Sequence, residues 1–311
     1  MSRLAAISAS PLLRNFAQGA AQSAVKPVAN FLAPGVDVPT MIGRYKKYDQ
    51  KSRFKVPSTL RGLGGRATRI GFTASDATYN AQPHALDFPI DNLEKIEGDQ
   101  ALMNMAQYGA SLVADVATLA HEMDVVTAAV TAAHANSSAT KDFTSGAIDP
   151  IVEIDKLILA CIKAVKNGAP IRVLFGAGAF LDFKSNAAVR GRFIVGKGAT
   201  PAALNVGIDD VGSLLFGNPQ VMMTTMVQDT AAEGLAENIS FILDKKVLVF
   251  AGNENPTTLD PSFMKTFRLM GQWMVPGAYP TEDQRGEVLK MDWSEDVEVT
   301  NSAAAFELID G

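Results

Sequence analysis

The sequence contains few of the side chains that enzymes and metal sites concentrate. Its 311 residues include one cysteine, three histidines and two tryptophans. One cysteine cannot form an internal disulfide, and Cys161 lies in a helical apolar pattern that predicts a small buried side chain. His121-Glu122 begins like a zinc-protease motif, but Val125 stands where the second histidine is needed, so we interpret His121 as a packed or surface helix residue. We therefore predict no metal site.

Motifs for acyl or nucleotide chemistry are also missing. There is no Gly-x-Ser-x-Gly elbow and no Walker loop. Gly176-x-Gly178 follows an apolar strand as in a dinucleotide fingerprint, but Leu181 occupies the third glycine position and no acid follows about 20 residues on. We predict that these glycines allow a tight strand-to-helix turn, and we keep an α/β nucleotide-binding enzyme as an alternative. The prediction is no catalytic residue and no cofactor.

Long apolar runs are absent as well. No window approaches the roughly 18 apolar residues that a membrane-spanning helix needs, so we predict no membrane span. Apolar residues nevertheless make up 47% of the chain, and its length suffices for one large domain or two smaller ones. Residues 1–26 carry basic side chains and no acid, which we interpret as a mobile arm or a removable pro-segment.

Acids are scarce at the start of the chain and in excess after it. Residues 1–70 hold 12 Lys and Arg against two acids, whereas the remaining 16 Lys and Arg face 31 acids. Such a split predicts that the basic part of one copy binds the acidic body of another. A nucleic-acid-binding arm is the competing interpretation, although no nucleic-acid motif accompanies the basic residues.

Basic residues are missing from one long stretch, with none between Lys95 and Lys141. Within it, apolar or small residues recur every three or four positions from Leu102 to Ala133, which predicts one continuous helix beginning at Asp99. Its length would be roughly 50 Å. A coiled coil or the core helix of an enzyme are alternatives, but the flanking positions are Ala, Thr, Ser and Gln rather than paired charges. We favour a scaffold helix that its neighbours cover.

Proline and glycine divide the chain before this helix. Four prolines punctuate residues 27–60 and indicate an extended strap. We predict a hairpin over residues 62–92, with its turn at Ser75-Asp76. Its strands would run from Arg66 to Ala74 and from His84 to Ile90, at edge positions, and it should dock on a neighbouring subunit because a lone hairpin is marginal in water. After the long helix we predict helices at Pro150–Lys166, around Ala179–Ala188 and from Thr200, and extended segments at Ile171–Phe175, Arg192–Val195, Val221–Val227, Lys246–Ala251, Val288–Trp293 and Val297–Ile309.

The order of these elements resembles that of the tailed-bacteriophage major capsid proteins, which have the Hong Kong 97 fold. The shared order is a basic arm, a glycine-hinged hairpin, one long Ala-rich helix with a late glutamate, and a mixed α/β body. Tyr79–Asp91 is similar to the return strand of that family's extended loop, and Leu112–Glu122 is similar to its spine helix. Further similar segments are Asp149-Pro150, Pro256–Phe267 and Val297–Leu308.

The resemblance implies an α+β shell subunit of the Hong Kong 97 type rather than an enzyme. Some members of the family crosslink covalently through a loop lysine, but the segment Arg66–Ile90 has no lysine, so we do not expect that chemistry here. The implied parts are an N-terminal arm (1–60), an extended β-hairpin loop (61–92), a peripheral domain with the spine helix (93–150), a mixed α/β axial domain (about 151–275) and C-terminal strands that return to the body (276–311).

The resemblance also implies partners and a location. Copies of the chain would meet as hexamers and pentamers in the icosahedral shell of a virion, assembled in the bacterial cytoplasm around double-stranded DNA that they touch weakly. Scaffold, portal and decoration proteins would be further partners, and no membrane is implied. An encapsulin-like shell around a protein cargo is the alternative. The side chains that we expect at subunit contacts are Arg44, Lys46, Lys47, Arg66, Arg69, Phe72 and Tyr79.

Overall fold

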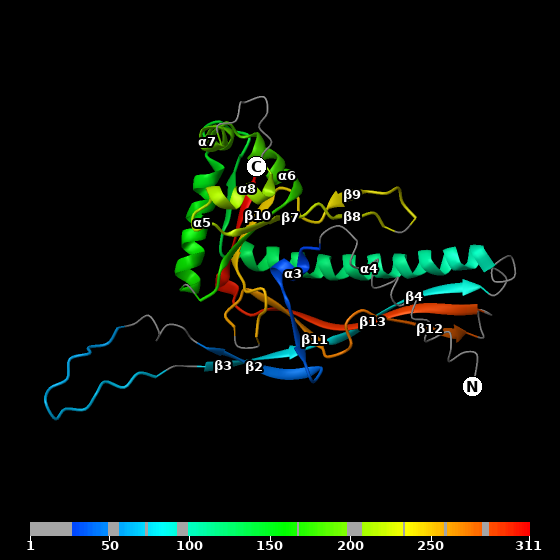
Figure 1. The fold of residues 1–311 in the computed structure, drawn as a ribbon, viewed down its shortest axis with the longest axis horizontal. Coiled ribbons are helices and arrows are strands. Elements are labelled where there is room, and N and C mark those ends of the chain that lie inside the picture. The colour runs from blue at the N-terminus through cyan, green and yellow to red at the C-terminus, as the bar shows by residue number, and fades with distance from the viewer. Residues whose placement is uncertain are drawn as a thin grey trace.

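The structure is a computed structural model, and it shows an elongated molecule in which one long helix links two sheets (Figure 1). An extended ribbon projects from one end of the body. The mixture of helices and strands confirms the predicted α+β class. The structure describes residues 27–48, 56–71, 74–91, 99–166, 168–197, 207–232, 234–257, 260–281 and 286–311.

The described chain runs through a first group of strands, a helix-rich middle and a second group of strands. The helices are α3 (Ala29–Leu32), α4 (Asp99–His134), α5 (Pro150–Val165), α6 (Ala177–Ser185), α7 (Ala187–Lys197) and α8 (Ile208–Val211), with short 3-10 turns at Gly212–Leu214 and Ser302–Ala304. The strands are β1 (Gly35–Val38), β2 (Ile42–Tyr48), β3 (Ala74–Asn80), β4 (Gln82–Asp91), β5 (Ser138–Lys141), β6 (Ile171–Phe175), β7 (Gln220–Met223), β8 (Val227–Asp229), β9 (Ile239–Phe241), β10 (Lys246–Ala251), β11 (Met264–Leu269), β12 (Val275–Thr281), β13 (Gly286–Val299) and β14 (Ala305–Asp310).

The predicted long helix is confirmed as α4, which ends at His134, one residue beyond the expected end. Its small residues let two separate cores form along one helix. Ala114 and Ala117 are buried in a core beneath β4 and β13. Val126 and Ala129, three turns further along, are buried in a second and larger core. The helix therefore holds the two cores at a fixed separation, which is the scaffold role that its composition predicts.

The first sheet has the strand order β1-β11-β13-β12, and β4 pairs with β13. The long strand β13 is the centre of this sheet because it pairs with β4, β11 and β12, all antiparallel. Leu86, Phe88 and Ile90 alternate along β4 and pack with Leu289 and Met291 into the core below α4. The predicted edge position of the strand with Pro83 and Pro89 agrees with its pairing to β13.

The second sheet has the order β5-β14-β10-β6-β7. Its central strand β10 is apolar and almost completely buried, as are β6 and the Phe183 ring of α6. The tight turn predicted at Gly176 is confirmed, since Gly176 is the N-cap of α6 and a Cβ there would lie 2.0 Å from the Asp244 carbonyl oxygen. Only glycine tolerates so close a backbone approach.

The predicted pairing of the hairpin is wrong. The described residues 56–71 form no strand, and Ser75-Asp76 lies inside β3 rather than in a turn. Strand β3 pairs with β2, whereas β4 pairs with β13. The physical reason is that β13 offers β4 ten paired positions over an apolar core, and a local turn offers no such core.

Two segments of the body also differ from the predictions. Residues Arg192–Val195 lie in helix α7 instead of an extended segment, because the Asn186 side chain accepts the Ala188 N–H at 2.8 Å and caps that helix. The predicted strand Val221–Val227 is divided into β7 and β8. The helix predicted around Ala179–Ala188 is interrupted at Asn186, between α6 and α7, and the extended segment Val297–Ile309 is interrupted by the 3-10 turn Ser302–Ala304. The other predicted helices and strands of the body are present, and the helix predicted from Thr200 begins outside the described residues.

Gly109 of α4 is expected to resist substitution even by alanine. Alanine normally stabilises a helix interior by about 1 kcal/mol relative to glycine. Here a Cβ would lie 2.5 Å from the Phe88 ring, so overpacking against β4 should reverse the sign, with a net loss of about 1 kcal/mol in urea unfolding. Gly191→Ala in α7 is the matched control, because nothing lies within 4 Å of its Cβ position and a gain is expected there. Equal gains in unfolding free energy at both positions would contradict the close packing of Gly109 on Phe88.

Candidate subunit-contact surfaces

An extended ribbon, which we define as β2, β3 and residues 56–71, projects away from the body (Figure 1). Its outer part exposes apolar side chains to an unusual degree, with Leu60 at 93% and Leu63 at 106% of full exposure. Arg66 and Arg69 are exposed beside them, and Arg44 is exposed on β2. These exposed apolar and basic side chains have the composition of a surface that another chain covers. Lys46 and Lys47 lie in β2, where their backbones pair with Asp76 and Ser75 of β3.

The other two predicted contact residues do not belong to this exposed surface. The subunit contact of Tyr79 stays a prediction: within its own chain Tyr79 is 6% exposed, and its ring stacks on Phe267 at 4.8 Å between centroids. An aromatic residue in an alternating strand looks the same in sequence whether it faces its own body or a neighbour. Phe72 lies outside the described residues.

The base of the ribbon is seated on the first sheet. The Tyr45 and Tyr79 rings both pack on Phe267, and the backbone N–H of Asn80 donates to Asp296 Oδ2 at 2.6 Å. Burial, with the nearby charges of Glu298 and Asp296, raises the pKa of Tyr45 to about 12. Its phenol therefore stays neutral at physiological pH, and the ribbon leaves the body from a fixed base.

A second anchored segment, residues 28–38, is built into the body. Val28, Ala29, Leu32 and Ala33 are almost completely buried, and β1 pairs in parallel with β11. The Glu122 carboxylate of α4 accepts the backbone N–H groups of Val28 at 3.1 Å and of Ala29 at 2.8 Å. Sequence reasoning expected an extended strap here and missed this packing, although the apolar run before Pro34 was a signal for it.

One turn of α4 carries a second buried polar contact. His121 Nδ1 and Glu295 Oε2 of β13 lie 2.5 Å apart, and both side chains are about 5% exposed. Trp293 donates its indole N–H to the other Glu295 oxygen at 2.8 Å, and Trp273 packs edge-on to the imidazole. Burial alone would raise the pKa of Glu295, but the His121 and Trp293 contacts bring it below its ordinary value. The interpretation of His121 as a packed helix residue is confirmed.

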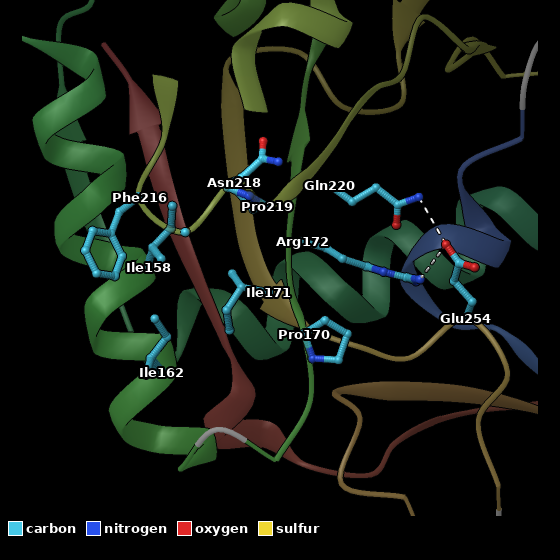
Figure 2. Close-up of a pocket in the computed structure, with 11 residues that line it drawn as sticks. Ile158, Ile162, Pro170, Ile171, Arg172, Phe216, Asn218, Pro219, Gln220 and Glu254 are labelled. Atoms are coloured by element: carbon cyan, nitrogen blue, oxygen red, sulfur yellow. Dashed lines mark hydrogen bonds and ion pairs between the residues drawn. The ribbon is translucent and has the colours of Figure 1, made fainter. Parts of the chain in front are cut away.

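A groove of about 450 Å³ opens between α5 and the β6–β7 edge of the second sheet (Figure 2). Figure 2 shows the Phe216 ring over α5 at one end and Arg172, Gln220 and Glu254 at the other. Arg172 and Glu254 form an ion pair at 3.6 Å, and Gln220 donates to the same carboxylate at 3.2 Å. We call this surface the α5 groove, and its walls are Ile158, Ile162, Pro170, Ile171, Arg172, Phe216, Gly217, Asn218, Pro219, Gln220 and Glu254.

Metal-binding clusters and membrane-spanning helices are both absent from the described residues. Across the nine described ranges, no group of three or more His, Cys, Asp or Glu side chains is placed to hold a metal ion. In the same part of the chain, no helix combines the length and apolar character needed to cross a membrane.

The comparisons with known sequences give one short match. No family model matches the chain. A major capsid protein of Pseudomonas phage JBD67 is 35% identical over 63 residues, which are 20% of this chain and 20% of that relative. The match therefore spans about a fifth of the length of the curated relative.

Comparisons with solved structures cover almost the whole chain. A phage-related protein of Bordetella bronchiseptica RB50 superposes with a TM-score of 0.71 at 17% identity, over 96% of both chains. The capsid of cyanophage P-SCSP1u gives a TM-score of 0.56 at 12% identity, over 90% of this chain and 86% of that chain. The SrpI encapsulin of Synechococcus elongatus PCC 7942 gives a TM-score of 0.52 at 12% identity, over 93% of this chain and 88% of that chain. The resemblance seen in the sequence is confirmed, and the chain has the Hong Kong 97 fold of phage major capsid proteins.

Proposed function

We propose that this chain is a major capsid protein, a structural subunit that self-assembles into an icosahedral shell around a phage double-stranded DNA genome. The extended ribbon is the observation that carries the proposal. Its outer part exposes apolar side chains such as Leu60 and Leu63 almost completely, and exposed apolar area of this kind is costly in a free monomer. Neighbouring copies in a shell would cover it.

The fold and the charge distribution support the same proposal. The cyanophage capsid protein shares the fold over 90% of the chain, and the stretch of sequence similar to a major capsid protein agrees with that class. The basic ribbon and the acidic remainder of the chain would attract each other between copies. Hexamers and pentamers would form the shell, and scaffold, portal and decoration proteins would be its further partners. The chain would reside in the virion after assembly in the bacterial cytoplasm.

The fold also suggests how the parts are used. We propose that residues 93–150 with α4 form the peripheral domain and that residues 151–275 form the axial domain around the symmetry axis. Residues 1–60 and 61–92 would be the arm and the extended loop, and residues 276–311 would return to the body. The pairing of β13 with β4 in the first sheet and of β14 with β10 in the second supports this last assignment.

A protein-enclosing shell of the encapsulin type is a second candidate. The SrpI encapsulin shares the fold over 93% of the chain with a TM-score of 0.52, close to the 0.56 of the cyanophage capsid. Electron microscopy and light scattering of the purified chain test shell formation, and the nucleic-acid content of particles isolated from infected cells separates the two candidates. A chain that stays monomeric with and without co-expressed phage proteins would overturn both.

Removing the charges of Arg66 and Arg69 is expected to weaken assembly. Each exposed ion pair contributes about 0.5 kcal/mol, so losing two should raise the protein concentration needed for assembly about fivefold. High salt should have the same effect on the unchanged chain, because it screens exposed charges. Arg66→Lys with Arg69→Lys is the control, since it keeps the charge. Light scattering as a function of protein concentration measures the effect. Normal assembly of the Arg66→Ala/Arg69→Ala variant at both low and high salt would contradict the electrostatic contact.

A further inference from the structure

The hairpin of β8 and β9 exposes an apolar face. Val227 pairs with Phe241 and Asp229 pairs with Ile239, so the side chains of these four residues lie on one face of the two-stranded sheet. Val227, Ile239 and Phe241 are each more than 40% exposed, and Leu235 in the connecting loop is 72% exposed. A two-stranded hairpin with an open apolar face normally has a partner that covers it.

This hairpin is nevertheless well ordered by its own hydrogen bonds. Asp229 accepts the backbone N–H groups of Ala231 and Asn238, both at 2.9 Å. Thr230 and Asn238 add a backbone bond at 3.0 Å across the loop. The two ends of the connecting loop are therefore fixed to each other, and preorganised segments bind with a smaller entropy loss.

The outer face of α5 carries a matching surface. Val152, Lys156, Leu159 and Lys163 are exposed at helical spacing of four, three and four residues, which places them in one stripe. Phe216, 52% exposed, stands beside this stripe because its backbone N–H donates to Asp155 Oδ1 at 2.8 Å. The stripe lies on the same helix as Ile158 and Ile162, which line the α5 groove together with Phe216 (Figure 2).

The charges of the two surfaces are complementary. The sequence from Val227 to Phe241 contains three acids and no Lys or Arg. The α5 stripe presents Lys156 and Lys163, with Lys156 also held by Glu153 at 2.6 Å. Opposite charge on two apolar patches favours one docked orientation and disfavours like-with-like contacts.

The two surfaces lie on opposite flanks of the second sheet. Figure 1 shows α5 at one flank and the β8–β9 hairpin projecting from the other. A single chain therefore cannot bring its own hairpin to its own α5 groove. Complementary patches on opposite sides of one subunit make head-to-tail contacts, which close into a ring when the rotation between copies allows.

We propose that the β8–β9 hairpin of one copy docks its apolar face on the α5 groove of the next copy, and that this contact joins neighbours into a capsomer ring. The occupant of the groove is thus a second copy of this chain. The inference rests on the proposed shell function and adds to it which two surfaces meet.

Disulfide trapping tests this contact. The double variant Ile239→Cys/Leu159→Cys carries one new thiol on each surface, and native Cys161 is buried. Mild oxidation should give a ladder of linked chains beyond the dimer on a non-reducing gel. Mixing the two single variants should give only dimers, because each chain then offers one surface. Ile239→Cys/Met270→Cys is the control, since Met270 is exposed on another part of the chain.

The outcomes separate this inference from the proposed function. A ladder from the double variant, with single variants unlinked on their own, supports the head-to-tail contact. Particles or rings by electron microscopy without a ladder overturn the inference and leave the shell function standing. A dimer formed by Ile239→Cys alone would indicate a symmetric contact and overturn it as well. A chain that stays monomeric in light scattering and unlinked would overturn both.

Charge reversal provides an independent readout. Lys163→Glu and Glu237→Lys should each weaken association several-fold, and combining them in one chain should restore it, because the opposite charges meet again. Additive losses in the combined variant would count against the docking.

Discussion

Replacing Glu122 with alanine is expected to lower the free energy of unfolding by about 3 kcal/mol, because two buried N–H groups lose their acceptor. The Glu122 side chain is fully buried and accepts the N–H groups of Val28 and Ala29 at the start of α3. The first N–H groups of a helix have no partner within it, so this carboxylate is what satisfies them. Urea unfolding of the unassembled chain, followed by tryptophan fluorescence, measures the loss.

Asp124→Ala is the matched control on the same helix, because Asp124 is exposed and its loss should cost less than about 0.5 kcal/mol. Glu122→Gln is a milder variant, since the amide oxygen still accepts one N–H while its NH₂ group faces the other; we expect a loss of about 1–2 kcal/mol. Equal urea-unfolding midpoints for Glu122→Ala and Asp124→Ala would contradict the view that Glu122 anchors the start of α3.

The Glu122 carboxylate also makes the stability of the folded chain depend on pH, in a direction that follows from its pKa. Burial raises the pKa of Glu122, and the Ala29 N–H and the neighbouring His121 only partly oppose this effect. The folded state therefore binds the Glu122 proton more tightly than the unfolded state does. Its contribution to stability is complete below the unfolded pKa of about 4.3 and declines as the pH rises through the folded pKa. The natural chain should exceed Glu122→Gln in free energy of unfolding by less at pH 7 than at pH 4.

The sequence was informative where a pattern had one physical explanation. The uninterrupted three-four spacing before Ala133 predicted one long continuous helix, and α4 is that helix. The expected covering of its stripe is incomplete within the chain, because Leu112, Val116 and Met123 are exposed. Gly176 likewise marked a tight turn before a helix. The pairing of β4 was not predictable in this way. Its alternating side chains fit any apolar partner, and the partner is β13, about 200 residues further along the chain.

The contact residues show the same limit. Arg66 and Arg69 were expected in a hairpin strand at a subunit contact; they are exposed but lie in no strand, and their contact with a neighbour stays a prediction. Tyr79 could have been on either face, and it packs on Phe267 of its own body. The β8–β9 hairpin was not recognised, since its two strands have three residues each and its loop is mostly polar and small.

Removing either partner of the buried His121–Glu295 pair is expected to destabilise the chain by about 3 kcal/mol, because the other side chain is left buried without its polar partner. Glu295→Gln is the better variant on the β13 side, since it keeps the acceptor for the Trp293 indole N–H and removes only the charge. The double variant with His121→Ala should lose less than the sum of the single losses, by about 1–3 kcal/mol.

His134→Ala is the matched control for this pair on the same helix. His134 lies 2.6 Å from Glu307 but is 56% exposed, and Glu307 keeps Lys246 at 2.8 Å when His134 is removed. An exposed pair of this kind contributes at most about 1 kcal/mol. Both tryptophans of the chain contact the buried pair, so their fluorescence in urea unfolding reports directly on this junction. If the stability losses of the His121→Ala and Glu295→Gln single variants simply add in the double variant, or if His134→Ala loses as much, then α4 and β13 are joined by apolar packing alone.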